Sequence, residues 1–545
     1  MTKKVFKKIG DILLLPLKEH FLFFILLCAL TISGHVLGYF YGNGELNQNA
    51  AIAVVMHCIS LSYLVTLLIS VIRSRVVRQI MQTMLILFAA FDFVLNFYCT
   101  VQLHYMFDAD IALLMLETNP NEAREFFSSM VPTWMLLALT GIFLLLLLFG
   151  WLINHHNLKL NLGKKTALLA LGLIGICIAG NLYRLEVWTF GPIGPFYQLT
   201  QHDNPSDLND YFSHPKLTFD ERNKLPDNVV LIIGESFTRC HSSLYGYDKL
   251  TNPHFTALKD SSLLFAFDSI DAPAPQTTMS LRYMLSTYSL SDEKKEKKWY
   301  EYISLIEMMK ESGFDCFWFG NQACVSKHNG ISRILAQACD RQWMLQTEGM
   351  IDAYDTRYDI VLVDSSYQFI NQLNQKKNHN FLIYHMMGSH FDYSKRYPKE
   401  FAKFSKNDYL TEPQNHREIL AIYDNSLYYN DYVVSRIMDL FKDTESIVIY
   451  LPDHGQVMYR DPSNPDYYSH GTGNPVAHAL GIDIPFFVYA SPLFQQKHPD
   501  VMERIKNRQE HPKSWNSEDL PYFIMDLIGV KTINGEEVRP RSVLN

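Results

Sequence analysis

The sequence predicts a chain of two parts, an α-helical membrane domain followed by an α/β domain with a mostly parallel sheet. Two observations predict it. Apolar runs of about 20 residues recur before residue 190, and such a run is long enough to cross a bilayer as a helix. After residue 228, short apolar runs alternate with longer stretches of helical periodicity, which is typical of parallel strands joined by crossover helices.

The membrane domain is expected at residues 1–189, with five spans. They cover residues 20–42, 50–72, 80–101, 131–153 and 166–185. Lys and Arg are retained on the cytoplasmic side of a membrane, and they gather here at the N-terminus and in the second and fourth loops. These residues are Lys3, Lys4, Lys7, Lys8, Arg73, Arg75, Arg78, Lys159, Lys164 and Lys165. The other two loops are acidic, so everything after residue 190 is expected outside the cytoplasm.

Charge separates the two parts of the chain. Residues 1–190 hold 13 Lys and Arg against 10 Asp and Glu, and the remainder holds 35 against 46, so the first part is +3 and the rest is −11. A net-acidic exported part argues against nucleic acid as a partner. The first span has the basic lead of a signal peptide but no small-residue cleavage site, and it is expected to stay as an anchor. Asp92, inside the third span, is either a polar contact between helices or a functional residue.

Beyond the spans, residues 190–225 are rich in Pro, Gly, Asp and Asn and are expected to form a linker along the membrane surface. Residues 226–545 are expected to form the exported α/β domain. Its candidate strands are "NVVLIIG", "SLLFAFDSI", "FDCFWFG", "NFLIYHM", "SIVIYLP" and "PFFVYA". Its four cysteines are even in number for an oxidising compartment, and Cys324 with Cys339 is the first candidate pair.

Acids and imidazoles follow several of these strands, where ligands bind in α/β sheets. Glu235 follows the first strand, Asp453 and His454 follow another in "LPDHG", and His390 follows a third in "MMGSH". His470 lies in "YSHGTG", in the loop after "LPDHG". A Glu after a strand is by itself more often a helix N-cap or a solvated loop residue, and His390 or His470 alone would mean little among 20 histidines. Asp453 and His454 are a stronger signal, because the Gly that follows permits a tight turn that aims both side chains the same way. Together they predict a metal site, because carboxylate and neutral imidazole are ligands of divalent cations.

A nucleophile is expected in "DAPAPQTTMSLRYMLS", residues 271–286. This segment presents Thr277, Thr278 and Ser280 at the start of a helix. Helix capping is the ordinary role of such residues. A metal ion beside the hydroxyl would lower its pKa, and the helix N-terminus would favour a phosphate arriving there. Capping and catalysis can both hold for adjacent residues.

The ordered set of motifs resembles the phosphoethanolamine transferases that modify lipid A and related surface glycolipids, a family that includes the mobile colistin-resistance enzymes. The resemblance rests on GES, a Thr-rich turn, GSH, DHG and HG, in this order, on five spans and an exported α/β domain. "GYDKLTNP", "IYDNSLYYNDYVVSRI" and "DLPYFIMDLIGV" support it, and it covers essentially the whole chain. It implies an alkaline-phosphatase-like fold in a bacterial inner-membrane protein, a periplasmic catalytic domain and a role in polymyxin resistance.

The resemblance also implies the residues of the site. It implies Zn²⁺, with Mn²⁺ as the alternative, held by Glu235, Thr277, Asp453 and His454. Thr277 is the implied nucleophile, and Thr278 is the alternative. His390 and His470 match family histidines near the phosphate or a second metal, where they would shuttle protons.

Three further residues are implied to bind the donor. Lys327 matches a family lysine at the donor head group, and Thr118 and Glu122 match two of three residues spaced by four on a helix that faces the site. Spacing by four places residues on one helical face, and Glu122 suits the cationic ethanolamine. The third position is Leu114, where the family has Asn.

The implied reaction moves phosphoethanolamine from phosphatidylethanolamine to lipid A or another surface glycolipid through a phospho-threonine intermediate. A phosphoglycerol transferase that uses phosphatidylglycerol, like the lipoteichoic acid synthases, is the main alternative. A sulfatase would need the C/S-x-P/A-S-R signature, and Cys240 is followed by "HSSLY" instead. A catalytically inactive membrane scaffold is the remaining alternative. The acceptor, the number of metals and the oligomeric state stay open.

Overall fold

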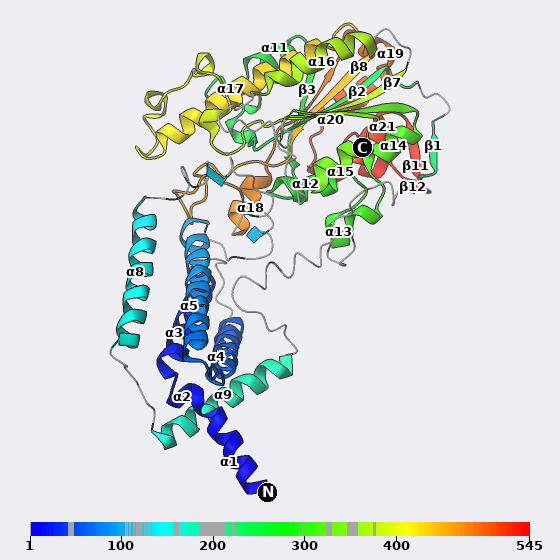
Figure 1. Ribbon diagram of the computed structural model, residues 1–545. Helices are drawn as coiled ribbons and strands as arrows, with labels where there is room; N and C mark the ends of the chain where they lie inside the picture. Colours follow the sequence, from blue (N-terminus) through cyan, green and yellow to red (C-terminus); the bar gives the residue numbers. More distant parts are fainter. Residues whose placement is uncertain are drawn as a thin grey trace. The chain divides into compact units, whose positions relative to one another are not determined.

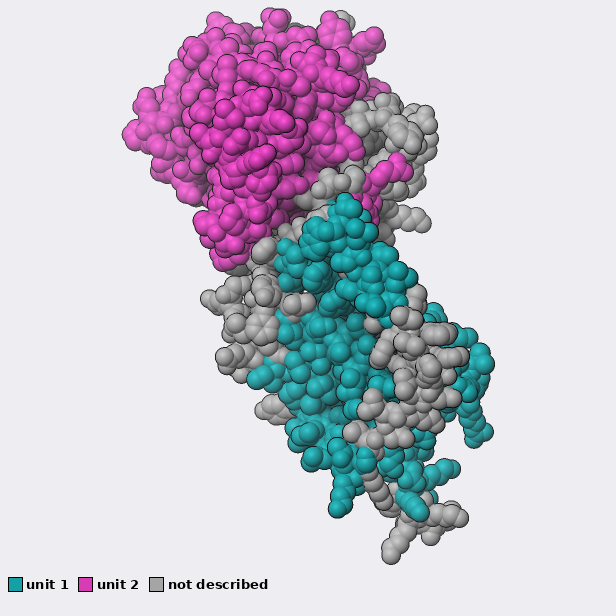
Figure 2. Space-filling view, turned by 90° about the vertical axis from the view of Figure 1, so that its left-hand side faces the viewer, with its two compact units in different colours: residues 1–116, 128–202 teal, residues 117–127, 203–545 magenta. Residues whose placement is uncertain are grey.

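The computed structural model divides the chain into two compact units. One comprises residues 1–116 and 128–202, and the other comprises residues 117–127 and 203–545 (Figure 2). The structure describes residues 2–41, 48–103, 133–155, 163–184, 214–220, 224–293, 298–322, 330–345, 358–373, 378–471 and 474–545, together with isolated residues between these ranges.

The first unit has a long helix at each of the five predicted positions. They are α3 (Phe21–Tyr41), α4 (Gln48–Ser70), α5 (Arg75–Tyr98), α8 (Thr133–His155) and α9 (Lys164–Arg184). By length and apolar composition, two described segments are able to cross a bilayer, Ile52–Ser70 and Arg75–Val101. Shorter apolar segments lie at Phe21–Gly34, Thr133–Leu145 and Lys165–Gly180. The arrangement as five spans therefore stays a prediction.

Two short helices precede these five, α1 (Thr2–Leu13) and α2 (Leu15–Lys18), and a π-helical turn at Cys99–Leu103 ends α5. Asp92 is buried within α5, and its carboxylate accepts a hydrogen bond of 3.0 Å from the amide of Asn96, one turn further along the same helix.

The second unit is built on a seven-stranded sheet with the order β3, β9, β8, β2, β7, β5, β6 (Figure 1). The strands are β2 (Asn228–Gly234), β3 (Leu264–Phe267), β5 (Phe314–Gly320), β6 (Arg341–Met344), β7 (His379–His385), β8 (Ser446–Pro452) and β9 (Phe486–Ala490). Only β9 runs antiparallel to both of its neighbours, so the mostly parallel sheet is confirmed.

Five shorter strands lie outside this sheet. A three-stranded sheet joins β1 (Leu217–Phe219), β11 (Val530–Ile533) and β12 (Glu536–Glu537), and β4 (Ile270–Asp271) pairs with β10 (Trp515–Asn516). All six candidate strands are present in the large sheet. The edge strand β6 was not predicted, because its four residues "RQWM" are partly exposed and form no apolar run.

Helices cover both faces of the large sheet. The helices described in this unit are α11 (Pro253–Asp260), α12 (Thr277–Met284), α13 (Leu290–Glu293), α14 (Leu305–Glu311), α15 (Gly330–Ala338), α16 (Ile360–Leu373), α17 (Arg417–Asp439), α18 (Pro475–Ile482), α19 (Pro492–Lys497), α20 (Pro499–Glu510) and α21 (Leu520–Leu527). Successive side chains of a strand point to opposite faces. Val229 and Leu231 accordingly pack in one apolar core with residues of α14, α15 and α21, and Val230 and Ile232 pack in another with residues of α16 and α17 (Figure 1).

The central strand β2 positions the site. It lies between β7 and β8, with Ile233 opposite His385 and Gly234 opposite Pro452. All three strands run in the same direction, so their carboxyl ends meet at one edge of the sheet. The segments that follow them, beginning at Glu235, Met386 and Asp453, therefore start side by side.

Candidate metal centre and active site

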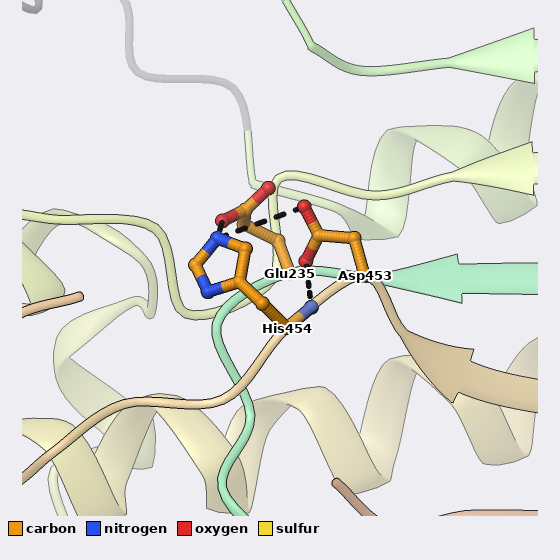
Figure 3. A group of neighbouring side chains, drawn as sticks. All are labelled: Glu235, Asp453 and His454. Atoms are coloured by element: carbon orange, nitrogen blue, oxygen red, sulfur yellow. Dashed lines mark hydrogen bonds and ion pairs between the residues drawn. The ribbon is translucent and has the colours of Figure 1, made fainter. Parts of the chain in front are cut away.

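Three side chains from two adjacent strand ends form a compact group. Glu235 follows β2, and Asp453 and His454 follow β8 (Figure 3). Each offers one ligand atom, and these atoms all lie within 4.8 Å of one another. All three residues are at most 1% exposed, so water contributes little to solvating their charges.

The main chain fixes both carboxylates. The Asp453 N–H donates to the carbonyl of Gly234 at 3.1 Å, which continues the pairing of β2 with β8 beyond the strands. Asp453 Oδ1 accepts the N–H groups of His454 at 2.8 Å and of Ser236 at 3.3 Å. Ser236 is in the left-handed region at φ 58°, and its hydroxyl donates to Glu235 Oε1 at 2.7 Å. The turn after β2 therefore holds Glu235 and Asp453 face to face.

The tautomer of His454 follows from its hydrogen bond. Its Nδ1 lies 2.8 Å from the carbonyl of Gly455, and because a carbonyl only accepts, Nδ1 carries a proton. In the neutral ring the lone pair is then on Nε2, which lies 3.1 Å from Glu235 Oε1 and 3.7 Å from Asp453 Oδ2 (Figure 3). Once Nε2 has lost its proton, the ring presents a ligand atom on the side of the two carboxylates.

The pKa values of the three groups show that the site attracts positive charge. Burial alone would raise the pKa of Glu235, but the charge and hydrogen bond of His454 hold it well below its usual value. Burial and the charge of Glu235 raise the pKa of Asp453 well above its usual value. Burial would lower the pKa of His454, but the charges of Asp453 and Glu235 raise it to about 9. Two carboxylates at this distance favour a neighbouring cation.

The donor set fits a divalent cation. Asp453 Oδ2 is buried without a hydrogen-bond partner among the residues that the structure describes, and His454 Nε2 is buried with the two carboxylates as its polar neighbours. Such buried polar atoms are costly unless something satisfies them. Two carboxylates and one imidazole are the ligand chemistry of zinc and related metals, so a metal ion would satisfy both atoms at once.

The Thr277 hydroxyl joins this group from α12. Thr277 is the first residue of the helix, and its Oγ1 donates to Glu235 Oε2 at 3.1 Å. Thr278 follows it on the same helix. Ser280 has another role, because it is fully buried and donates to the carbonyl of Ala274 at 2.7 Å. Of the three candidate hydroxyls, the structure therefore connects Thr277 with Glu235 and gives Ser280 to the turn that precedes the helix.

Gln322 is a site residue that the sequence analysis missed. Its amide donates to Glu235 Oε2 at 2.9 Å and to the carbonyl of Met386 at 3.0 Å. It lies two residues beyond β5, which pairs with β7. Its position at the carboxyl end of a strand was therefore the one feature of the sequence that could have predicted a role in the site. A single amide in a loop gave no chemical signal of its own.

Asp359 was also missed, and it supports the site from behind. It is fully buried, and its carboxylate accepts the N–H groups of Met387 at 2.9 Å and Gly388 at 2.7 Å. Ser389, the next residue, donates its N–H to the carbonyl of Glu235 at 3.0 Å. Asp359 therefore holds the turn after β7 against the main chain of Glu235.

Both predicted histidines lie near the group. The ring of His470 is 4.8 Å from the ring of His454, and its Nδ1 is 3.2 Å from Ser469 Oγ. Burial, followed by the charge of His454, lowers the pKa of His470 to about 3, so its ring is neutral at physiological pH. His390 follows the turn after β7, and its charge acts on both Glu235 and His470.

Several predicted residues lie outside the described residues. Thr118, Glu122 and Lys327 are among them, and so is Cys324, the proposed disulfide partner of Cys339. Their roles stay predictions.

Comparison with known proteins matches both parts of the chain. Residues 227–530, more than half of the chain, match the sulfatase family model. Residues 61–188 match the model described as phosphoethanolamine transferase EptA/EptB. The Kdo(2)-lipid A phosphoethanolamine 7''-transferase of Salmonella typhimurium is 25% identical over 371 residues, which cover 66% of this chain and 61% of that protein.

Two further relatives have solved structures. Phosphoethanolamine transferase EptC of Escherichia coli is 28% identical over 457 residues, 78% of this chain and 75% of that protein. The crystal structure of its C-terminal periplasmic domain, in complex with Zn, matches 61% of this chain and 90% of that domain at 27% identity and a TM-score of 0.52. The integral membrane protein EptA of Neisseria meningitidis shares the fold over 94% of this chain and 96% of its own, at 17% identity and a TM-score of 0.64.

Proposed function

The chain belongs to the sulfatase family, as one of its phosphoethanolamine transferases, and from this we propose that it moves phosphoethanolamine from phosphatidylethanolamine to lipid A or another surface glycolipid. The names of the relatives support phosphoethanolamine as the transferred group and a lipid A-type acceptor. The observation that carries the proposal is the hydrogen bond from the Thr277 hydroxyl to Glu235, which puts a nucleophile beside a candidate metal centre.

The enzyme is a membrane protein with its catalytic unit in the periplasm. Similarity in fold to an integral membrane protein over nearly the whole chain supports a membrane domain followed by a soluble domain. The five apolar helices at residues 1–189 cross the bacterial inner membrane, residues 190–225 lead along its surface, and residues 226–545 carry the chemistry. The basic loops on one side of these helices support this orientation.

Glu235, Asp453 and His454 hold the metal, with Thr277 as the fourth ligand. The zinc in the related periplasmic domain supports Zn²⁺, and the oxygen-rich donor set also suits Mn²⁺. When bound, the metal neutralises charge on the transferred phosphoryl group and lowers the pKa of the coordinated hydroxyl.

Thr277 is the nucleophile of a two-step transfer. Its Oγ1 forms a bond to the phosphorus of phosphatidylethanolamine, the bond from phosphorus to the diacylglycerol oxygen breaks, and diacylglycerol leaves after taking up a proton. An oxygen of the acceptor glycolipid then attacks the phosphorus, and the bond to Thr277 breaks. Glu235 orients the hydroxyl before the attack, because Thr277 Oγ1 donates to Glu235 Oε2. Gln322 holds this carboxylate in place, because its amide donates to the same oxygen.

The remaining predicted residues act on protons and on the donor. His390 or His470 shuttles the proton between the nucleophile and the leaving oxygen, because an imidazole can both accept and donate a proton. Lys327, Thr118 and Glu122 bind the donor head group, with the Glu122 carboxylate on the ammonium.

Intact-mass spectrometry of the full-length protein tests this proposal. Wild type, Thr277→Ala and Thr278→Ala would each be exposed to nanodiscs of phosphatidylethanolamine and, separately, of phosphatidylglycerol. We expect one phosphoethanolamine adduct on wild type and on Thr278→Ala, and none on Thr277→Ala.

Each other result has a definite meaning. A phosphoglycerol adduct would mean that the donor is phosphatidylglycerol and not phosphatidylethanolamine. An adduct that is lost only in Thr278→Ala would move the nucleophile by one residue. No adduct with either lipid would favour the inactive scaffold.

A further inference from the structure

The first helix, α1, separates its residues by charge. At 3.6 residues per turn, Lys3, Lys4, Lys7 and Lys8 fall within an arc of about 140°, together with Asp11. The opposite arc of this helix holds the apolar residues Val5, Phe6, Ile9, Ile12 and Leu13. A helix with one strongly basic face and one apolar face is typical of segments that lie in a membrane surface.

The apolar face of α1 is not covered by the part of the chain that the structure describes. Val5 is 49% exposed, Ile9 is 47% exposed and Ile12 is 36% exposed. On the opposite face, Lys7 and Lys8 are also exposed. A row of exposed apolar residues on a short helix calls for a partner with an apolar surface.

The C-terminal end of α1 is fixed to the helices of the membrane domain. Leu14 and Leu17, which follow α1, are buried in a cluster with Phe24 of α3 and Tyr63 of α4. The Tyr63 hydroxyl donates to the carbonyl of Leu13, the last residue of α1, at 2.7 Å. The C-terminal end of α1 is therefore fixed beside α3 and α4.

The same end of the bundle carries other basic residues. Arg78, near the start of α5, donates to the carbonyl of Ile72 at 2.9 Å in the loop after α4, and Gln82 of α5 contacts His20, which precedes α3. Arg73 lies in the same loop, and Arg75 is the first residue of α5. The exposed Lys7 and Lys8 of α1 thus add to a basic rim, and the complement of such a rim is an anionic surface.

We propose that α1 lies in the membrane interface at this end of the bundle, with Val5, Ile9 and Ile12 among the acyl chains and its lysines on anionic phospholipid headgroups. The apolar face contacts lipid, and the positive charge of the opposite face favours anionic lipid. This interaction is independent of the transfer reaction, which takes place in the other unit of the chain.

Hydrogen–deuterium exchange of the full-length protein in nanodiscs tests the proposal. Phosphatidylethanolamine would be mixed with phosphatidylglycerol in one preparation and with phosphatidylcholine in the other. We expect amides of residues 2–13 to exchange about tenfold more slowly in the anionic nanodiscs, and the difference to shrink at high salt. Equal exchange in the two lipids would overturn the proposal.

Three variants make the result specific. Ile9→Asp places a charge on the apolar face and should restore fast exchange in the anionic lipid. Lys7→Gln combined with Lys8→Gln should reduce the difference between the two lipids. Lys399→Gln, an exposed position in the other unit, is the matched control and should leave exchange of residues 2–13 unchanged. Slow exchange that persists in Ile9→Asp would mean that something other than lipid covers the helix, and it would also overturn the proposal.

Discussion

The carboxylate of Glu235 is the most heavily constrained group in the site. It accepts hydrogen bonds from Ser236, Thr277 and Gln322, and it lies 3.1 Å from the ring of His454. Such a carboxylate has little freedom to turn away from the other two candidate ligands. The site is therefore organised before any cation or lipid arrives.

Gln322→Ala should weaken catalysis while leaving the fold intact. The change removes one neutral donor from a charged acceptor, an interaction worth about 1.5–3 kcal/mol, so we expect kcat/KM to fall by about tenfold or more. Zinc affinity should fall less, because both carboxylates and the imidazole remain. Gln342→Ala, on the exposed edge strand β6, is the control, and an equal loss of activity there would argue against a role for Gln322.

His385 predicts a pH dependence of stability. It is fully buried at the end of β7, with its ring 5.8 Å from that of Trp318, and burial lowers its pKa to about 4. The folded state then binds fewer protons than the unfolded state between pH 6.5 and 4. The contribution of this histidine is complete above about pH 6.5 and is lost as the pH falls toward 4, by about 1.4 kcal/mol per pH unit.

His385→Phe keeps a ring beside Trp318 and removes this titration. Denaturant unfolding of residues 203–545 should show the variant gaining stability relative to wild type as the pH falls from 6.5 to 4. His511→Phe, at an exposed position, should show no such trend. Parallel curves for wild type and His385→Phe would contradict the prediction.

The structure brings together those predicted residues whose chemistry and position in the sheet agreed. Glu235, Asp453 and His454 were predicted together because acids and imidazoles at neighbouring strand ends are unusual, and the structure brings them within ligand distance. Gln322, Asp359 and His385 were not predicted, because each acts through a neighbour and none has a motif of its own. Their roles depend on pairing between strands far apart in the chain.

At the scale of elements, the turn after β7 has no room for a side chain at Gly388. Gly388 is at φ +49°, and a Cβ on it would lie 2.7 Å from the main-chain nitrogen of Glu235. Asp359 fixes this turn from the other side through two N–H groups. The turn has no room to move away from the strand end that carries Glu235.

Gly388→Ala should therefore displace Glu235. We expect zinc affinity to fall by at least about tenfold, since one ligand loses its place, and the free energy of unfolding to fall by about 1–3 kcal/mol. Gly246→Ala is the matched control, because Gly246 is also at positive φ, +96°, but a Cβ there has nothing within 4 Å. Gly246→Ala should lower the free energy of unfolding only by the added backbone strain, and it should leave zinc affinity unchanged. Equal effects in both variants would remove the steric argument.

Elements were easier to predict from sequence than their neighbours in the sheet. Continuous apolar runs identified β2, β5, β7 and β8, because strands covered by helices on both faces need no polar side. These patterns did not predict the antiparallel direction of β9, since direction depends on the connection and not on the composition of the strand. They also did not predict the edge strand β6, whose residues form no apolar run.

At the scale of the whole molecule, metal removal should destabilise the second unit. Without a cation, Glu235 and Asp453 are two buried carboxylates in contact with one imidazole. A ligand that binds only the folded state stabilises it, so a chelator should lower the Tm of residues 203–545 by about 2 °C or more. Calorimetry with and without chelator measures this shift. Asp453→Asn should reduce the response, and an unchanged Tm in wild type would mean that no metal supports the fold.

The order of the strands has a consequence for how the protein matures. Asn228 at the start of β2 accepts a hydrogen bond from the Asn380 amide and donates one to the Ser446 hydroxyl, and these partners lie 152 and 218 residues further along the chain. Glu235 is thus synthesised long before Asp453 and His454, and the three candidate ligands come together only when β2 and β8 have paired. Metal capture would then be a late step of folding, and we expect a chain whose sheet has not closed to be inactive.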